Sequence, residues 1–200
     1  MVIMRELDFI NTIERLKDTG FSPCPDIVRI SVPNAKEVLM RGLEHFLGKE
    51  NVKWLPEYEH VTQWLSDNKG RGLLLVGDCG RGKSLICRKI LPIVINYYFK
   101  KNVTVYDATD LNKKSMTNEI LSSHLTCLDD LGTENELNDF GTKRIVFCEL
   151  ADLAEKQGKI LLLTTNLSEE ELRQKYGERT IDRLHAITRK IVFRGNSLRR

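Results

Sequence analysis

The sequence lacks a long apolar run, and this excludes a membrane-spanning helix. Its longest apolar stretches are about five residues, whereas a transmembrane helix needs roughly 18. Near the N-terminus, Arg5, Glu6 and Asp8 stand where a signal peptide would need an apolar core. We therefore expect a cytoplasmic protein that makes no contact with a membrane.

Paired cysteines and clustered histidines are also lacking. The four histidines show no metal-ligand spacing, and the five cysteines form no CxxC pair: Cys24, Cys79, Cys87, Cys127 and Cys148. This usage predicts reduced thiols in the cytosol and no structural metal.

The chain as a whole has only a small excess of positive charge, but its C-terminal end has a large one. The net charge is +3, yet residues 173–200 hold nine basic residues against Glu178 and Asp182. Such an end suggests contact with phosphates, either of nucleic acid or of a nucleotide on a neighbouring subunit. A solvated basic surface is the simpler alternative.

Apolar strands and helices alternate from Gly72 onward. The expected strands are 73–76, 103–106, 125–128, 160–164 and 190–193, and the expected helices are 83–99, with a kink at Pro92, 143–157, 169–175 and 180–186. Strands this apolar are typical of a parallel sheet covered on both faces. We predict a three-layer αβα core with a five-stranded parallel sheet.

The first seventy residues look helical and irregular instead. Phe9, Ile13 and Leu16 fall on one helical face, and Asn34 with Glu37 resembles a capping box for a second helix. A third helix carries Val61, Trp64 and Leu65. We divide the chain into a helical N-terminal extension, residues 1–52, and a main domain, residues 53–200.

The strongest motif is GDCGRGKS at residues 77–84, which fits the phosphate-binding loop G-x-x-x-x-G-K-[ST] between a strand and a helix. Lys83 is expected to bridge the phosphates, and the Ser84 hydroxyl to ligate Mg²⁺. A chance glycine-rich turn is the alternative. The residues expected to bind ATP are Gly77, Asp78, Cys79, Gly80, Arg81, Gly82, Lys83, Ser84 and Leu85.

Two aspartates follow the third expected strand, in HLTCLDDLG at residues 124–132. This is the Walker B pattern, in which Asp129 would hold Mg²⁺ and Asp130 would act as the general base on the attacking water. Taken alone, such aspartates are more often a loop or a helix cap. Their distance from the phosphate loop favours the catalytic interpretation.

Asn166 stands at the end of the fourth expected strand, where open α/β sheets place ligands. It could hydrogen-bond the γ-phosphate or the water, or instead cap the helix near Glu169. The segment lacks the N-K-x-D box of GTPases, and small-molecule kinases do not need the second acid. Hydrolysis of ATP fits best.

Four segments resemble the AAA+ ATPases of the bacterial replicative-helicase loader group, DnaC and DnaI, and the related IstB transposition helpers. They are GRGLLLVGDCGRGKS, LTCLDDLG, KILLLTTNLS and YGERTIDRL, and the likeness covers about residues 54–195. The resemblance implies a reduced or absent lid, which suits a chain that stops soon after the fifth strand. It also implies that Arg183 is an arginine finger reaching a neighbouring protomer's nucleotide.

Three features remain open after this resemblance. Arg179 could share the role of Arg183, and either could simply pair with Glu178 or Asp182. Asp130 stands where many AAA+ proteins have glutamate, so we expect slow hydrolysis. The N-terminal residues match nothing in the family, so helicase and transposase stay alternative partners.

Loaders bind single-stranded DNA, and the candidate contacts are basic: Lys100, Lys101, Lys113, Lys114, Arg194, Arg199 and Arg200. The N-terminal helix is a candidate for docking on a helicase or for packing on its own core. A nucleotide-gated adaptor with little hydrolysis and a small-molecule kinase are the rival functions.

Overall fold

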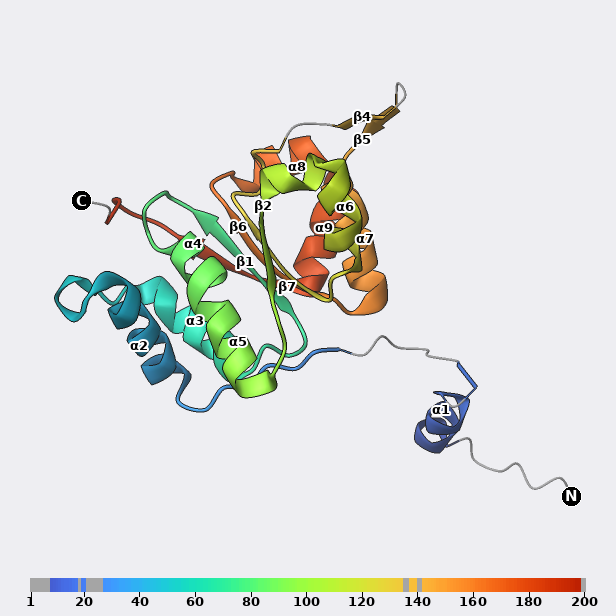
Figure 1. Cartoon of the computed structure of the whole chain (residues 1–200), viewed down its shortest axis with the longest axis horizontal. Helices are drawn as coiled ribbons and strands as arrows, with labels where there is room; N and C mark the ends of the chain where they lie inside the picture. Colours follow the sequence, from blue (N-terminus) through green and yellow to red (C-terminus); the bar gives the residue numbers. More distant parts are fainter. Residues whose placement is uncertain (1–7, 18, 21–26, 135–136, 140–141, 199–200) are drawn as a thin grey trace, which may run out of the picture.

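The computed structural model describes residues 8–17, 19–20, 27–134, 137–139 and 142–198, and it contains the expected parallel sheet (Figure 1). Five strands pair in parallel in the order β2-β3-β6-β1-β7. Their bounds are Gly72–Gly77 for β1, Thr104–Asp107 for β2, Leu125–Asp129 for β3, Ile160–Thr165 for β6 and Thr188–Phe193 for β7. All five predicted strands are confirmed.

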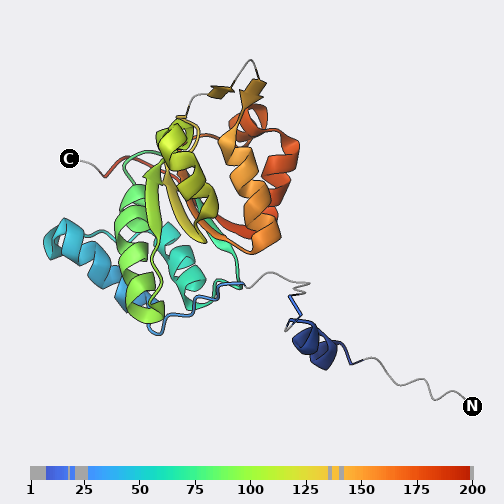
Figure 2. The ribbon, with the colours of Figure 1, turned by 45° about the vertical axis from the view of Figure 1, so that its right-hand side comes forward.

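Helices cover both faces of this sheet, so the chain forms the three predicted layers (Figures 1 and 2). One layer holds α2 (Ala35–Leu47), α3 (Pro56–Ser66) and the helix that follows the phosphate loop. The other holds α6 (Lys114–Ser122), α7 (Val146–Gln157), α8 (Glu169–Tyr176) and α9 (Glu178–Ile187).

Alternation along β1 shows how one strand serves both layers. Leu73 and Leu75 belong to the core on the α2–α3 side, whereas Leu74 and Val76 belong to the core on the α7–α9 side. Successive side chains of a strand point to opposite faces, so an all-apolar strand must be buried on both. The burial of β1 thus fixes the two helical layers.

The helix after the phosphate loop is interrupted before its proline. It runs through α4 (Lys83–Leu85), a π-helical segment (Ile86–Ile90) and α5 (Leu91–Phe99). Pro92 lies in the first turn of α5, where its missing N–H costs little. The irregularity predicted at Pro92 lies just before that residue, in the π-helical segment that ends at Ile90.

Several elements differ from the sequence prediction. Asn34 precedes α2 in a left-handed conformation and makes no side-chain cap, so the predicted capping box is wrong. Helix α7 begins at Val146 rather than at residue 143, because residues 142–144 form a strand. This strand, β5 (Thr142–Arg144), pairs antiparallel with β4 (Leu137–Asp139). The β4–β5 pair, α6 and the 3-10 turns Lys49–Asn51 and Ala108–Asn112 were not predicted.

The N-terminal region divides into two parts in the structure. Helix α1 (Phe9–Lys17) has no buried residue and lies apart from the sheet in Figures 1 and 2. Helix α2 instead packs into the main core through Leu39 and Leu43. The division at residues 52 and 53 stays a prediction, since α2 shares its core with the sheet and helices that follow it.

Some residues named in the sequence analysis lie outside the described residues, among them Cys24, Arg199 and Arg200. Within the described ranges, no helix is long and apolar enough to span a bilayer.

Asn68 joins the segment before α2 to the start of β1. Its buried side chain accepts from the Ile30 and Gly70 N–H groups at 2.9 and 3.0 Å, and donates to the Val28 and Arg71 carbonyls at 3.3 and 3.1 Å. The side chain therefore satisfies four main-chain groups at once.

We expect Asn68→Ala to lower the free energy of unfolding by about 3 kcal/mol, because buried main-chain groups lose their partners. The matched control is Asn102→Ala, at an exposed residue that accepts from the Asn96 side chain, and it should change stability by less than about 0.5 kcal/mol. Urea denaturation measures both. Equal losses in the two variants would contradict the assignment.

Candidate functional site

The phosphate loop leaves the end of β1 and enters α4 through a turn that requires glycine. Gly77 and Gly82 have φ angles of 123° and 91°. A Cβ on Gly77 would lie 2.1 Å from the Phe193 carbonyl oxygen, and one on Gly82 would lie 2.7 Å from the Tyr58 hydroxyl. Both positions therefore exclude a side chain, because of the backbone angle and because of the space available.

Lys83 is the centre of the loop. Its buried ammonium donates to the Gly77 and Asp78 carbonyls, both at 2.7 Å, and to Asn166 Oδ1 at 2.9 Å. Burial lowers the pKa of Lys83, and the nearby Cys79, Asp130, Asp78 and Asp129 oppose that shift. The loop thus folds around a cation that two of its own carbonyls hold in place.

The two Walker B aspartates have different surroundings. Asp129 is buried, and its two carboxylate oxygens accept from the Thr164 hydroxyl at 2.5 Å and from Arg88 at 3.3 Å. Asp130 is half-buried and has a left-handed φ of 55°, and its N–H donates to the Thr164 hydroxyl oxygen at 3.0 Å. Thr164 therefore positions both aspartates at the end of β3.

Asn166 connects the loop to the Walker B turn. Its amide accepts from Lys83 and donates to Asp130 Oδ1 at 3.3 Å. The cap of α8 is Ser168, which forms a capping box with Glu171. The alternative that Asn166 caps this helix is therefore wrong.

These side chains surround a cavity of about 610 Å³, a size typical of ligand sites. Its walls come from the phosphate loop, the ends of β3 and β6, the segment around α2 and α3, and the chain after β7. The lining residues are Leu47, Asn51, Lys53, Tyr58, Cys79, Gly80, Gly82, Lys83, Ser84, Leu85, Asp130, Asn166 and Leu198.

Arg81 faces away from this cavity although it lies within the motif. Its buried guanidinium donates to one oxygen of Glu57 at 2.6 and 2.8 Å, and Tyr58 donates to its carbonyl at 3.1 Å. Burial, with the Glu57 charge, raises the pKa of Tyr58 to about 12. The side chain of Arg81 anchors the loop to α3, so only its main chain is left for a ligand.

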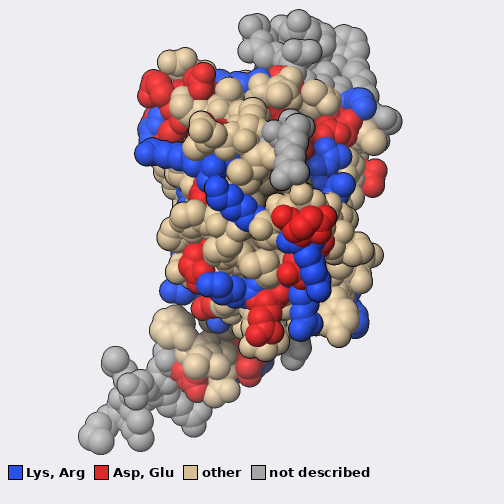
Figure 3. All heavy atoms as spheres, turned by 90° about the vertical axis from the view of Figure 1, so that its left-hand side faces the viewer, with Lys and Arg blue, Asp and Glu red and all other residues tan. Residues whose placement is uncertain are grey.

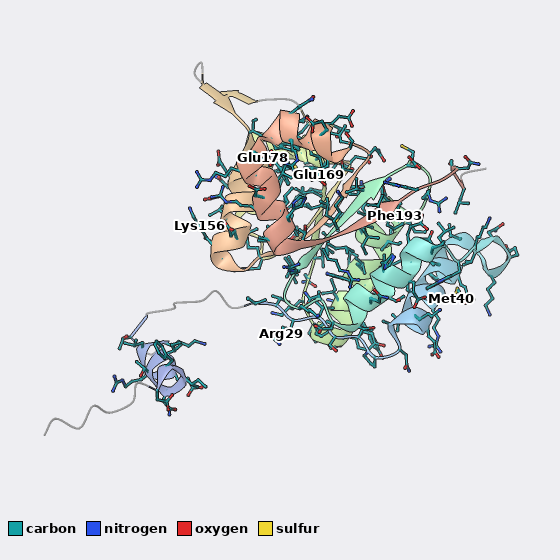
Figure 4. All side chains as sticks on the ribbon, turned by 180° about the vertical axis from the view of Figure 1, so that it is seen from behind. Arg29, Met40, Lys156, Glu169, Glu178 and Phe193 are labelled. Carbon is teal, nitrogen blue, oxygen red and sulfur yellow. The ribbon has the colours of Figure 1, made fainter. Side chains whose placement is uncertain are left out.

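Arg183 lies on the far layer, away from the phosphate loop. It pairs with Asp152 at 2.6 Å and Glu155 at 2.8 Å, both on α7, rather than with Glu178 or Asp182. Glu178 pairs with Arg173 instead, and Arg179 is exposed. Figure 4 shows this corner from behind, with Glu169 and Glu178 labelled on α8 and α9.

Arg88 was missed in the sequence, where it resembles any helix-surface arginine. It lies in the π-helical segment and pairs with both Asp107 and Asp129, at the ends of neighbouring strands. Its hydrogen bond to Asp107 is the main reason that its pKa is raised. Arg88 therefore places a positive charge next to the Walker B carboxylate of Asp129.

A second missed group clamps the Walker B turn. Glu134 is buried and accepts from the Tyr176 hydroxyl and from the Gly132 N–H, while Lys175 donates to the Gly132 and Glu134 carbonyls. Burial raises the pKa of Tyr176. The YGER segment that looked like an interface signature thus also fixes the turn after Asp130.

The residues present are compatible with a magnesium ion that shares its coordination with phosphates. Among the residues that the structure describes, no three carboxylate, histidine or cysteine side chains form a metal cage. Mg²⁺ at phosphates needs only one or two protein oxygens, since water and phosphate supply the rest. Ser84 lines the cavity, and Asp129 ends β3 directly before the cavity-lining Asp130.

We expect Glu57→Ala to lower the free energy of unfolding by about 3 to 5 kcal/mol, because it leaves the buried Arg81 charge uncompensated. The control is Glu59→Ala, also on α3, which removes an exposed pair with Lys36 on α2 and should cost less than about 1 kcal/mol. Chemical denaturation compares them. A loss at position 57 no larger than that at 59 would show that the buried pair does not stabilise the loop.

Comparison with known proteins finds similar solved structures but no similar family model or curated sequence. No family model matches this chain, and no curated protein sequence does either. The DnaC helicase loader structure is 20% identical with a TM-score of 0.53, and the match covers 82% of this chain and 93% of that one.

Two further structures show the same likeness. DnaI is 18% identical with a TM-score of 0.53, over 84% of this chain and 86% of that one. AMPPCP-bound DnaA from Aquifex aeolicus is 16% identical with a TM-score of 0.50, over 71% of this chain and 49% of that one. The chain therefore has the three-layer αβα P-loop NTPase fold seen in the DnaC and DnaI structures, as its motifs predicted.

Proposed function

We propose that this protein is a cytoplasmic AAA+ ATPase of the helicase-loader type. The observation that carries the proposal is the pair of hydrogen bonds that connects Lys83 to Asn166 and Asn166 to Asp130 in the cavity lining. Through them the Asn166 amide connects the ammonium proposed to bind phosphate with the carboxylate proposed to act as general base. The likeness to a DnaA structure that holds AMPPCP supports ATP as the nucleotide.

The side chains have separate roles in this proposal. The main chain of residues 77–85 and the Lys83 ammonium bind the phosphates. Ser84 and Asp129 would hold Mg²⁺, which would neutralise charge at the phosphates. Asp130 accepts the proton of the attacking water, and Asn166 orients that water. The side chain of Asp130 is one methylene shorter than that of glutamate and reaches less far toward the attacking water, so we expect slow turnover.

Arg183 is the proposed arginine finger of a self-associating protein. In this chain it is paired with Asp152 and Glu155, so a neighbour's γ-phosphate must compete with two carboxylates. That competition would keep unassembled protein inactive. Arg179 is the exposed candidate nearby, and comparison of the two variants assigns the role.

The proposed partners are a replicative helicase and single-stranded DNA. The DnaC structure is that of a helicase loader by its description, and we extend this role to the present chain. Lys100, Lys101, Lys113 and Arg194 are exposed and available to phosphates, although Figure 3 shows basic and acidic side chains interspersed on one face. The alternatives remain an IstB-like transposition helper and an adaptor that hydrolyses little.

We expect the ATPase rate per protomer to rise with protein concentration and with single-stranded DNA. Lys83→Ala should abolish the rate by removing the phosphate cation, and Arg183→Ala should lower it at least about tenfold by removing the trans charge. A steady-state phosphate-release assay measures this, with Lys156→Ala, an exposed residue on α7, as the matched control.

Two outcomes would redirect the proposal. ATP binding with negligible turnover at every concentration would favour the adaptor. An Arg183→Ala rate equal to wild type, with a loss in Arg179→Ala, would move the finger to Arg179.

Helix α1 is the proposed helicase contact, because its apolar residues Phe9 and Ile10 are 67% and 73% exposed. Deleting residues 1–20 should leave ATP affinity and the melting temperature unchanged and abolish co-sedimentation with a hexameric replicative helicase. Loss of folding on deletion would indicate instead that α1 packs on its own core.

A further inference from the structure

The chain after β7 crosses the outside of the phosphate loop. Phe193, labelled in Figure 4, ends β7, and residues 194–198, here called the strap, continue past the loop. The Gly195 N–H donates to Asp78 at 2.7 Å, and the Leu198 N–H donates to the Gly80 carbonyl at 3.0 Å. The strap is thus bonded to the middle of the loop at two separate points.

The buried pair of Arg81 and Glu57 extends these contacts. Arg81 donates to the Asn196 carbonyl at 3.2 Å, and the Arg194 N–H donates to the same Glu57 oxygen that holds Arg81, also at 3.2 Å. Gly195 has a φ of 122°, and a Cβ there would lie 2.8 Å from the Arg81 guanidinium. Glycine therefore lets the strap approach the loop closely, which a larger residue would prevent.

This path brings Leu198 to the wall of the cavity. The cavity has two chemically different parts. Around Lys83, Asp130 and Asn166 its groups are charged or polar, whereas Leu47, Leu85 and Leu198 supply apolar surface. Leu47 and Leu198 are each 41% exposed, so this surface is open to a ligand.

We propose that the strap forms one wall of a nucleoside pocket, in which Leu198 packs against the planar base of the nucleotide. The inference rests on the proposed ATP-binding function and adds a contact residue to it. The triphosphate occupies the polar part of the cavity, so the base attached to it extends into the remaining volume. Apolar walls with a few polar groups are the usual surroundings of such a ring system.

The strap also links base to phosphate in this arrangement. Because Leu198 bonds to Gly80 and Gly195 bonds to Asp78, a base that packs on Leu198 holds the strap, and the strap holds the loop. A nucleotide then binds more tightly than its phosphates alone. That difference is what an experiment can measure.

The test compares ATP with tripolyphosphate, which has the phosphates and no base. In wild type and Leu198→Ala, both with magnesium present, titration calorimetry gives the two affinities. We expect Leu198→Ala to weaken ATP about fivefold, the loss for part of a leucine side chain, and to leave tripolyphosphate unchanged within about twofold. Ile93→Ala, at an exposed apolar residue on α5 outside the cavity lining, is the matched control.

The outcomes separate the two proposals. Unchanged ATP affinity in Leu198→Ala, or an equal loss for ATP and tripolyphosphate, would overturn the base contact while the proposed ATP-binding function stands. Failure of folded wild-type protein to bind ATP would overturn the proposed function, and the nucleoside pocket with it.

Discussion

The position of the Lys83 ammonium is the interaction on which the rest of the site depends. A buried cation needs several oxygen partners, and Lys83 finds them in the Gly77 and Asp78 carbonyls and in Asn166. The two carbonyls belong to the end of β1 and the loop, whereas Asn166 follows β6. The parallel pairing of β1 with β6 therefore decides whether these groups can meet.

The same parallel sheet places the other groups of the site. Strand β3 pairs with β6, so Asp129 and Asp130 end beside Thr164 and Asn166, and β2 brings Asp107 next to Asp129. Arg88 then crosses from the π-helical segment to both carboxylates. A widened turn is frequent at functional sites, and here it begins directly after α4.

Around this centre, the loop is held from outside as well as from within. Glu57 on α3 and the strap after β7 bind Arg81, Asp78 and Gly80, and Glu134 with Tyr176 and Lys175 fixes the turn after Asp130. Elements distant in sequence thus hold both the phosphate loop and the turn after Asp130. Because these contacts fix both segments, the site can be rigid although its residues lie on loops.

The sequence by itself determined the strands, the motif and the identity of the candidate groups. Uninterrupted apolar runs require burial on both faces, and the glycine pattern of residues 77–84 favours a loop that wraps an anion. Asn166 could be predicted because it directly follows a buried apolar strand, at the edge of the sheet where ligands bind. The role of Arg183 came from resemblance and stays a prediction.

Only the tertiary structure decided which partners these groups have. The pairing of Arg81 with Glu57 joins residues 24 apart, and the strap contact of Gly195 with Asp78 joins residues 117 apart. The β4–β5 pair and the turn held by Glu134 have no apolar periodicity from which they could be predicted. The periodicity of apolar residues predicts which face of a helix or strand is buried. Contacts between side chains distant in sequence depend on how the layers pack against one another, and no single segment of the sequence determines that packing.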